Sequence, residues 1–209
     1  MPHCNLDLMR RSDEGPGMTD ATPGASGFFL LVRQDIAHFA RRDGETVNWR
    51  FLLRLFLLTQ GFQFVLARRL QDVLPRVPLV GRPARRIWWW WTCRRFGAEL
   101  AIDATFGGGL YIPHPYGIVI GACSVGCDVA ILQNVTVGTR GPDDVGRATI
   151  GDGTYLAAGA VILGPVLIGA GAKIGANAVV LANVAAGEAA VGIPARTVRS
   201  GQTTDIHLK

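Results

Sequence analysis

The spacing of hydrophobic residues changes character about halfway along the chain. In the second half, aliphatic residues recur at intervals of six with one interruption. A period of six fits neither an alternating strand nor a helix of 3.6 residues per turn. It is typical of a parallel β-helix built from hexapeptide repeats, in which three short strands make one triangular coil and each aliphatic side chain points into the prism. The set comprises Val125, Ile131, Val137, Ile150, Leu156, Ile162, Ile168, Ile174 and Val180.

The first half of the chain has a helical rather than a six-residue spacing. Between residues 28 and 96 glycine is rare, and apolar residues recur as in Phe51, Leu52 and Leu55. We therefore expect an N-terminal α-helical domain at 28–96 and a β-helix domain at 97–199. Residues 1–27 lack the large apolar side chains needed to offset the entropy of ordering, which predicts a disordered tail. The polar residues 200–209 predict a C-terminal tail.

The six-residue period is interrupted at "GTRGPDDVGRA", residues 138–148. Thirteen residues separate Val137 from Ile150, and the segment between them is polar and rich in glycine. We expect a loop extruded from one coil, which is where a rigid scaffold commonly carries function. Arg140 and Arg147 in this loop either bind an anionic group or keep the loop solvated.

The net charge is +5, and much of the basic charge lies between residues 67 and 96, interleaved with apolar residues. This pattern does not favour nucleic-acid binding. Within it, Trp88–Trp91 form a run of four indoles that covers every side of a helical turn. The preferred interpretation is contact with the second domain or another subunit. The alternative is peripheral contact with a membrane surface beside the neighbouring arginines. The apolar run at 51–67 is shorter and more polar than a spanning helix requires.

The four cysteines are Cys4, Cys93, Cys123 and Cys127, and no secretory signal precedes them. This favours reduced thiols and a cytoplasmic location. The pair in "CSVGC" lacks the spacing of a zinc knuckle, and no second pair accompanies it. No metal cofactor is expected.

One histidine stands between two prolines in "GGGLYIPHPYGIVIG", just before the repeats become regular. A neutral imidazole can remove the proton of a hydroxyl as that hydroxyl attacks a thioester carbonyl. His114 is therefore a candidate general base. The alternative is a turn histidine bonded to a backbone carbonyl.

Several phrases of the sequence occur together in one known family. The helical region, "GLYIPHPYGIVIG", "ILQNVTVG", the polar loop, "IGDGTYLAAGAVILG" and "AAVGIPARTV" follow one another much as in the serine acetyltransferase family of hexapeptide acyltransferases, which residues 30–199 resemble. The resemblance implies a left-handed β-helix and transfer of an acetyl group from acetyl-CoA to a hydroxyl. It also implies a homotrimer with sites between subunits, and leaves open whether two trimers join.

The resemblance assigns roles to individual residues. His114 would be the catalytic base and Glu99, fifteen residues earlier, the carboxylate that orients it. Asp43 would help to bind the acceptor, together with Arg147 and Arg140 of the loop. Lys173 is equally consistent with an ordinary surface lysine. The positions expected to contact CoA are Thr139, Ala158, Gly159, Lys173 and Ala176.

The chain departs from the serine-specific members of this family at its acceptor site. Pro113 stands where they have an aspartate, and "GRATI" keeps Arg147 but lacks the histidine that follows it in those enzymes. The loop is similar to that of capsule and colanic-acid type acetyltransferases. We therefore predict a saccharide or similar metabolite as the acceptor. The alternatives are a serine O-acetyltransferase serving cysteine biosynthesis and a non-catalytic trimeric scaffold.

The spacing of the repeats is also irregular beside the predicted active site. Between Gly121 and Ile131 the chain is one residue short of the family spacing. We expect the coil there to be tightened or bulged.

Overall fold

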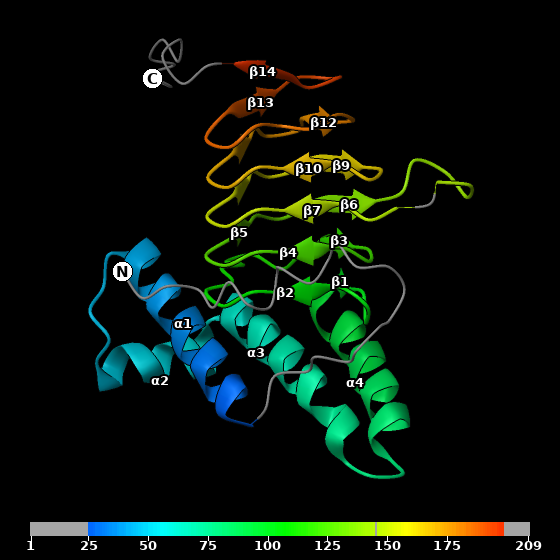
Figure 1. The fold of residues 1–209 in the computed structure, drawn as a ribbon. Helices are drawn as coiled ribbons and strands as arrows, with labels where there is room; N and C mark the ends of the chain where they lie inside the picture. Colours follow the sequence, from blue (N-terminus) through cyan, green and yellow to red (C-terminus); the bar gives the residue numbers. More distant parts are fainter. Residues whose placement is uncertain (1–24, 145, 199–209) are drawn as a thin grey trace.

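The computed structural model describes residues 25–144 and 146–198, so the predicted tails lie largely or wholly outside the described residues. A group of helices forms one end of the molecule, and a stack of strands rises from it (Figure 1). The chain thus has the two parts that its hydrophobic spacing predicts.

Within residues 25–96, the helical part consists of four α-helices and a short 3₁₀ helix. Asn48 caps the second α-helix, because its side-chain oxygen accepts a hydrogen bond of 2.9 Å from the backbone N–H of Phe51. The fourth ends at Gly97, which adopts the left-handed conformation with φ 63° that commonly terminates a helix. The helices are α1 (Ala25–Asp43), α2 (Trp49–Leu58), α3 (Gln60–Val73), η2 (Leu74–Arg76) and α4 (Gly81–Phe96).

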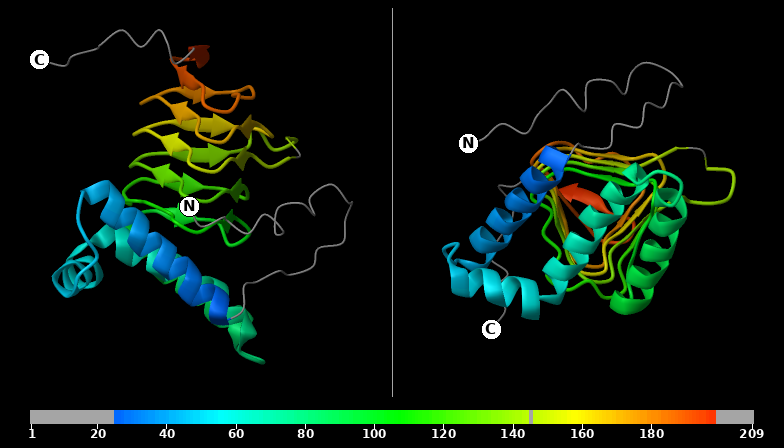
Figure 2. Two further views of the ribbon diagram at one scale, coloured as in Figure 1. Left: turned by 60° about the vertical axis from the view of Figure 1, so that its left-hand side comes forward. Right: turned by 90° about the horizontal axis from the view of Figure 1, so that it is seen from below.

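The strands form three sheets that are the faces of a triangular prism, visible from below in Figure 2. Every strand pair is parallel except β13–β14, which confirms the predicted parallel β-helix. Sheet A contains β1 (Glu99–Leu100), β3 (Val119–Ile120), β6 (Thr136–Gly138), β9 (Val161–Leu163) and β12 (Val179–Val180). Sheet B contains β2 (Thr105–Phe106), β4 (Ser124–Val125), β7 (Thr149–Ile150) and β10 (Leu167–Ile168). Sheet C contains β5 (Ala130–Ile131), β8 (Tyr155–Leu156), β11 (Lys173–Ile174), β13 (Ala189–Val191) and β14 (Arg196–Val198).

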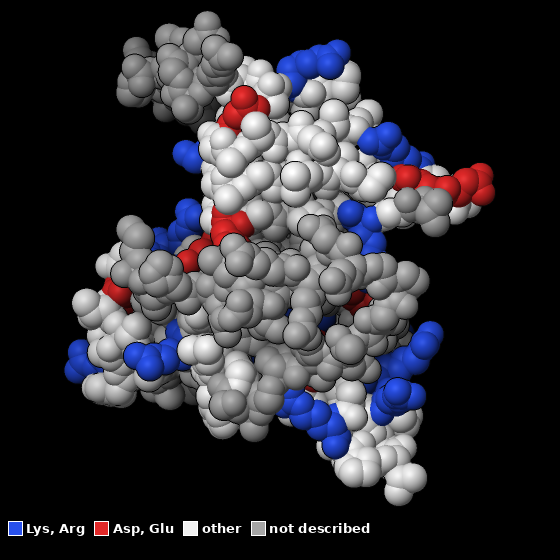
Figure 3. Space-filling view, in the orientation of Figure 1, with Lys and Arg blue, Asp and Glu red and all other residues white. Residues whose placement is uncertain are grey.

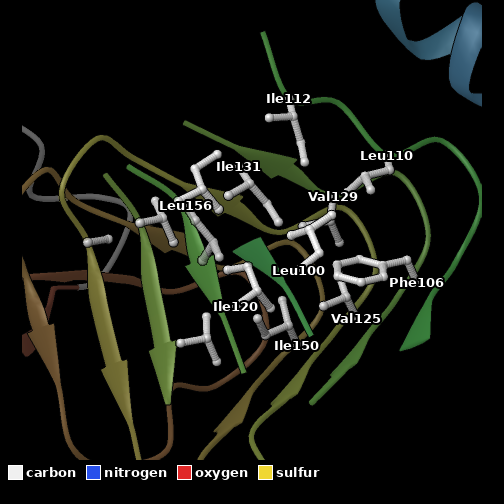
Figure 4. Packing of buried hydrophobic residues seen from close by; sticks show 14 of the residues in the cluster. Leu100, Phe106, Leu110, Ile112, Ile120, Val125, Val129, Ile131, Ile150 and Leu156 are labelled. Atoms are coloured by element: carbon white, nitrogen blue, oxygen red, sulfur yellow. The ribbon is translucent and has the colours of Figure 1, made fainter. Parts of the chain in front are cut away.

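The core of the prism is one continuous aliphatic column. All nine residues of the six-residue period are at most 2% exposed, and Figure 4 shows the lower part of the column. Each coil buries three inward side chains against the coils above and below. Stacking therefore stabilises the prism as a whole rather than one coil at a time.

The coil that begins at β3 is one residue shorter than the coil that begins at β9. Eighteen residues separate the paired strands at Val161 and Val179, but only seventeen separate Val119 and Thr136. The missing residue falls at Gly121–Cys123, where three residues join β3 to β4. This confirms the predicted tightening.

A buried ion pair fastens the helices to the first coil of the prism. Asp35 of α1 and Arg69 of α3 are each about 1% exposed in their side chains, and two hydrogen bonds of 2.9 and 3.0 Å join them. Arg69 also donates to the carbonyl oxygens of Phe106 and Gly107, and Asp35 accepts from the backbone N–H of Leu110. Two helices thus fix the position of residues 106–110, which precede the predicted base in the sequence.

The four tryptophans of α4 divide into two pairs. Trp88 donates its indole N–H to the carbonyl of Ala67 at 2.9 Å, and Trp89 donates to Leu100 at 3.1 Å. The predicted contact with the second domain therefore applies to Trp89, whereas Trp88 contacts α3 of its own domain. Trp90 and Trp91 remain 53% and 45% exposed.

Within the described ranges, no single helix is long and apolar enough to cross a membrane. The helix α2 and the helical segment Gln60–Arg76 have the necessary length and apolar composition only when taken together, and they are bent by 79° relative to each other.

The cysteines were predicted to be reduced thiols. Cys93 and Cys123 are free thiols, as predicted. For Cys127 the prediction is wrong, because this residue is disulfide-bonded.

Candidate active site

His114 lies at the corner where the chain passes from sheet C to sheet A, and we call the column of such corners the C–A edge. Backbone hydrogen bonds of 2.9 Å stack successive corners: Asn134 donates to Tyr116, Gly159 to Gln133 and Asn177 to Ala158. With a strand spacing of about 4.8 Å, the corner at Ala158 lies roughly 10 Å above that of His114. Three of the predicted CoA positions, Ala158, Gly159 and Ala176, therefore share an edge with the predicted base.

The imidazole of His114 faces solvent. Among the described residues it has no hydrogen bond or ion pair, so the structure contains no contact corresponding to a turn histidine bonded to a carbonyl. Both ring nitrogens are available to a substrate. This exposure at an otherwise rigid corner is what a general base requires.

The start of α3 supports this corner from below. A Cβ atom on Gly61 would lie 1.9 Å from the carbonyl oxygen of Ile112 and 2.7 Å from that of Pro113, so the helix backbone directly abuts the residues before His114. On the other side of the histidine, Tyr116 donates its hydroxyl to the side chain of Gln60. Sequence reasoning missed this support; its signal was a glycine within a helical pattern.

Glu99 begins β1 near the same edge. Its Cα pairs with that of Val119, and its backbone N–H donates to Ile118 at 2.7 Å. No hydrogen bond or ion pair joins Glu99 to His114 among the described residues. Its charge acts on Cys93, whose pKa is raised to about 11, first by burial and then by the Glu99 carboxylate.

Asp43 ends α1 and reaches the segment that leads to His114. Its carboxylate accepts from the hydroxyl of Tyr111 at 3.4 Å and pairs with Arg54 at 3.1 Å. Burial, and then the Asp43 charge, raise the pKa of the Tyr111 hydroxyl. Arg54 also pairs with Glu45 at 2.6 Å, so one guanidinium bridges two carboxylates beside the candidate site.

The extruded loop leaves the prism at a different corner, between sheet A and sheet B (Figure 1). Arg140 folds back onto the prism, where it donates to the carbonyls of Leu163 and Leu181. Arg147 is exposed and near Cys123, whose pKa rises to about 12 because burial outweighs the opposing effect of Arg147. The loop arginines and His114 thus lie on different edges of one chain.

The two remaining predicted CoA positions are more scattered. Thr139 follows β6 at the foot of the loop, and Lys173 begins β11, where its Cα pairs with that of Tyr155. Both side chains are exposed. Over residues 25–144 and 146–198, no group of three His, Cys, Asp or Glu side chains could hold a metal ion.

A hexapeptide prism with an exposed histidine at one edge and a loop at another is characteristic of one class of transferases. The family model described as "Bacterial transferase hexapeptide (six repeats)" matches residues 147–182. The serine acetyltransferase of Bacillus subtilis (strain 168) is 33% identical over 175 residues, covering 82% of this chain and 77% of that protein. The chain therefore belongs to the serine acetyltransferase family, and its prism is a left-handed parallel β-helix.

Two other members illustrate the range of the similarity. "Probable serine acetyltransferase 4" of Oryza sativa subsp. japonica is 48% identical over 173 residues, which cover 80% of this chain and 52% of that protein. A solved structure, "Serine Acetyltransferase- Complex with CoA", has a TM-score of 0.72 and 30% identity, and covers 83% of this chain and 71% of that one. The chain spans about half the length of several relatives that it matches.

Proposed function

We propose that this chain is a serine O-acetyltransferase, which moves an acetyl group from acetyl-CoA to the hydroxyl of serine. The observation that carries the proposal is the similarity to the Bacillus subtilis serine acetyltransferase across 77% of that enzyme. The prediction of a saccharide acceptor was wrong, because the relatives and solved structures are serine acetyltransferases. The loop pattern on which it rested is too short to decide the acceptor.

The chemistry that we assign to His114 is general base catalysis. Its exposed imidazole would take the proton of the serine hydroxyl as the oxygen attacks the thioester carbonyl. The acetyl group passes to serine, and the CoA thiolate leaves and is protonated. We assign to Glu99 the orientation of the imidazole, although this requires a movement, since the two side chains do not touch. Such contacts often tighten only when substrate is bound.

We propose that Asp43 binds the ammonium group of serine and Arg147 its carboxylate, with Arg140 bracing the loop. Pro113 offers no carboxylate of its own, whereas Asp43 accepts a hydrogen bond from Tyr111, three residues before His114. Arg54 already pairs with Asp43 at 3.1 Å, so an ammonium group would share that carboxylate with a guanidinium. We therefore expect serine to bind more weakly than at a site with two free carboxylates.

For CoA we propose a path along the C–A edge. Ala158, Gly159 and Ala176 offer small side chains and backbone groups there, which allows a long flexible ligand to lie close to the main chain. We assign Lys173 to its polar groups, since it supplies a cation suited to a phosphate. We assign Thr139 to the CoA bound by a neighbouring subunit, because this residue lies at the foot of the loop, on a different corner of the prism.

We further propose a homotrimer, because one chain keeps its loop and its histidine on different edges. In a ring of three prisms, the A–B corner of one subunit can face the C–A edge of the next. Arg147 of one copy would then complete the site of another. We also retain the prediction of a cytoplasmic location, which the free thiols of Cys93 and Cys123 support and the disulfide at Cys127 opposes.

The proposal is tested by following thiol release from acetyl-CoA with L-serine and with a panel of sugars. We expect saturable release with serine, and a fall in kcat of about 10²–10⁴ for His114→Ala at unchanged helix content. Release with a sugar but not with serine would contradict the proposed acceptor. No release with any acceptor would favour the scaffold alternative, and an unimpaired His114→Ala would exclude this histidine as the base.

A further inference from the structure

The α3–α4 turn and the outer side of α4 form a surface that combines exposed apolar and basic side chains. Neither the core nor the candidate active site uses it. In Figure 3 the blue side chains gather at the lower right, over α4, with uncharged side chains projecting below them. We define the arginine–tryptophan surface by its apolar residues Val77, Leu79, Val80, Ile87, Trp90 and Trp91 and its basic residues Arg76, Arg82, Arg86, Arg94 and Arg95.

The fold does not account for Trp90, whereas the ring of Trp91 packs against that of Trp88, with ring centroids 5.1 Å apart. Trp88 and Trp89 already supply the indole contacts that fix α4 against Ala67 and Leu100. Trp90 donates no hydrogen bond to a described residue and lies beneath the guanidinium of Arg94, with that carbon 5.0 Å from the ring centroid. The aromatic ring and the charge are thus presented to solvent together.

The turn at the end of this surface carries a conformational cost. Leu79 is 100% exposed and adopts the left-handed conformation with φ 67°, which branched and bulky residues rarely do. The exposed side chain of Leu79 makes no favourable contribution to folding. Its transfer from water into an apolar medium would lower the free energy, because apolar surface would be buried.

We infer that the arginine–tryptophan surface docks the protein on an anionic membrane surface. Indoles prefer the headgroup region, where the ring is buried and the N–H stays wet, and arginines beside them attract acidic lipids. The helix has five arginines and no acidic residue. From Arg82 to Arg95 it is about 20 Å long, so it can lie in the plane of the headgroups.

A second copy of the chain is a poorer occupant of this surface. In a two-fold contact, the arginine rows of both copies would face each other without a carboxylate on α4 to neutralise them. A membrane rich in acidic headgroups provides the opposite charge over the whole length of the helix. Charge complementarity therefore favours lipid.

The inference is tested by sedimentation of the full chain with vesicles of phosphatidylcholine alone and with added phosphatidylserine. We expect binding only to the anionic vesicles, and a decrease in binding on going from 0.1 M to 1 M salt as the Debye length falls from about 10 to about 3 Å. Arg86→Gln with Arg94→Gln should weaken binding roughly twenty- to thirty-fold, since each arginine near such a surface contributes about fivefold. Trp90→Ser should weaken it at least about tenfold.

Trp49→Ser provides the matched control. Trp49 is 68% exposed on α2, which also displays Leu53 and Leu57, and its loss should leave vesicle binding unchanged. Thermal unfolding of each variant confirms that the fold is retained. Binding lost with Trp49→Ser but kept with Trp90→Ser would move the contact to α2 and overturn the inference. So would binding to single-stranded oligonucleotides without binding to vesicles, or self-association that Trp90→Ser abolishes. Serine-dependent thiol release measures the proposed function independently of these outcomes.

Discussion

At the scale of single residues, Gly61 determines how closely α3 approaches the corner that carries His114. Any side chain there meets the carbonyl oxygens of Ile112 and Pro113, both of which are backbone atoms. The corner cannot yield without displacing the histidine two positions further on. Gly61 thus links a packing requirement to the placement of the candidate base.

We expect Gly61→Ala to lower the free energy of unfolding by about 1–3 kcal/mol, because an added methyl group overpacks this contact. It should also lower kcat of serine-dependent thiol release. Denaturant unfolding and steady-state kinetics measure the two effects. Gly141→Ala is the control, since a Cβ there meets nothing within 4 Å. Equal unfolding midpoints for both variants would contradict the close approach.

At the scale of elements, the Asp35–Arg69 pair makes the helices and the first coil one unit. Both side chains are buried and each also bonds the backbone of the segment from Phe106 to Leu110. A buried ion pair is costly to break from one side, since the remaining charge loses its partner.

We expect Asp35→Ala to lower the free energy of unfolding by about 3–5 kcal/mol. The double variant Asp35→Leu with Arg69→Met should lose less than the sum of its two single variants, because it leaves no unpaired charge. Chemical denaturation of the three variants completes the cycle. Strictly additive losses would show that the two side chains are energetically independent.

The elements also differ in how far the sequence predicts them. The six-residue period predicts the buried column from Val125 to Val180, because each coil repeats the same local geometry. It does not predict that Trp88 and Trp89 face the chain while Trp90 and Trp91 face solvent, since four identical residues carry no directional pattern. It also cannot show that Gly61 supports the corner of His114, which depends on contacts between residues about 50 positions apart.

At the candidate site, too, the sequence predicts which residues matter better than it predicts how they are arranged. The motif around His114 predicts a candidate base, and the stacking of the coils places Ala158, Gly159 and Ala176 on the same edge as this residue in the structure. The acceptor could not be predicted from Pro113 and a short loop, because the lack of one carboxylate does not show which other groups bind the acceptor. The saccharide prediction was overturned by the similarity to serine acetyltransferases.

At the scale of the whole molecule, the separation of the loop from the histidine edge makes oligomerisation a condition for activity in our proposal. In this proposal each site takes His114 from one copy of the trimer and Arg147 from its neighbour. An equal mixture of His114→Ala and Arg147→Ala, under conditions that exchange subunits, should then restore about a quarter of the wild-type sites. Thiol release before and after exchange measures this. Activity that stays at the level of the unmixed variants would show that each chain carries a complete site.

The last strand of the prism is the one that runs against the others, since β14 pairs antiparallel with β13. A stack of parallel coils presents the same unpaired backbone at its end whatever its length, and that end is a template on which another chain could add. By reversing direction, β14 covers this template on sheet C and interrupts the repeat. The helices cover the opposite end (Figure 2). A structure that could in principle grow without limit is therefore closed at a defined number of coils.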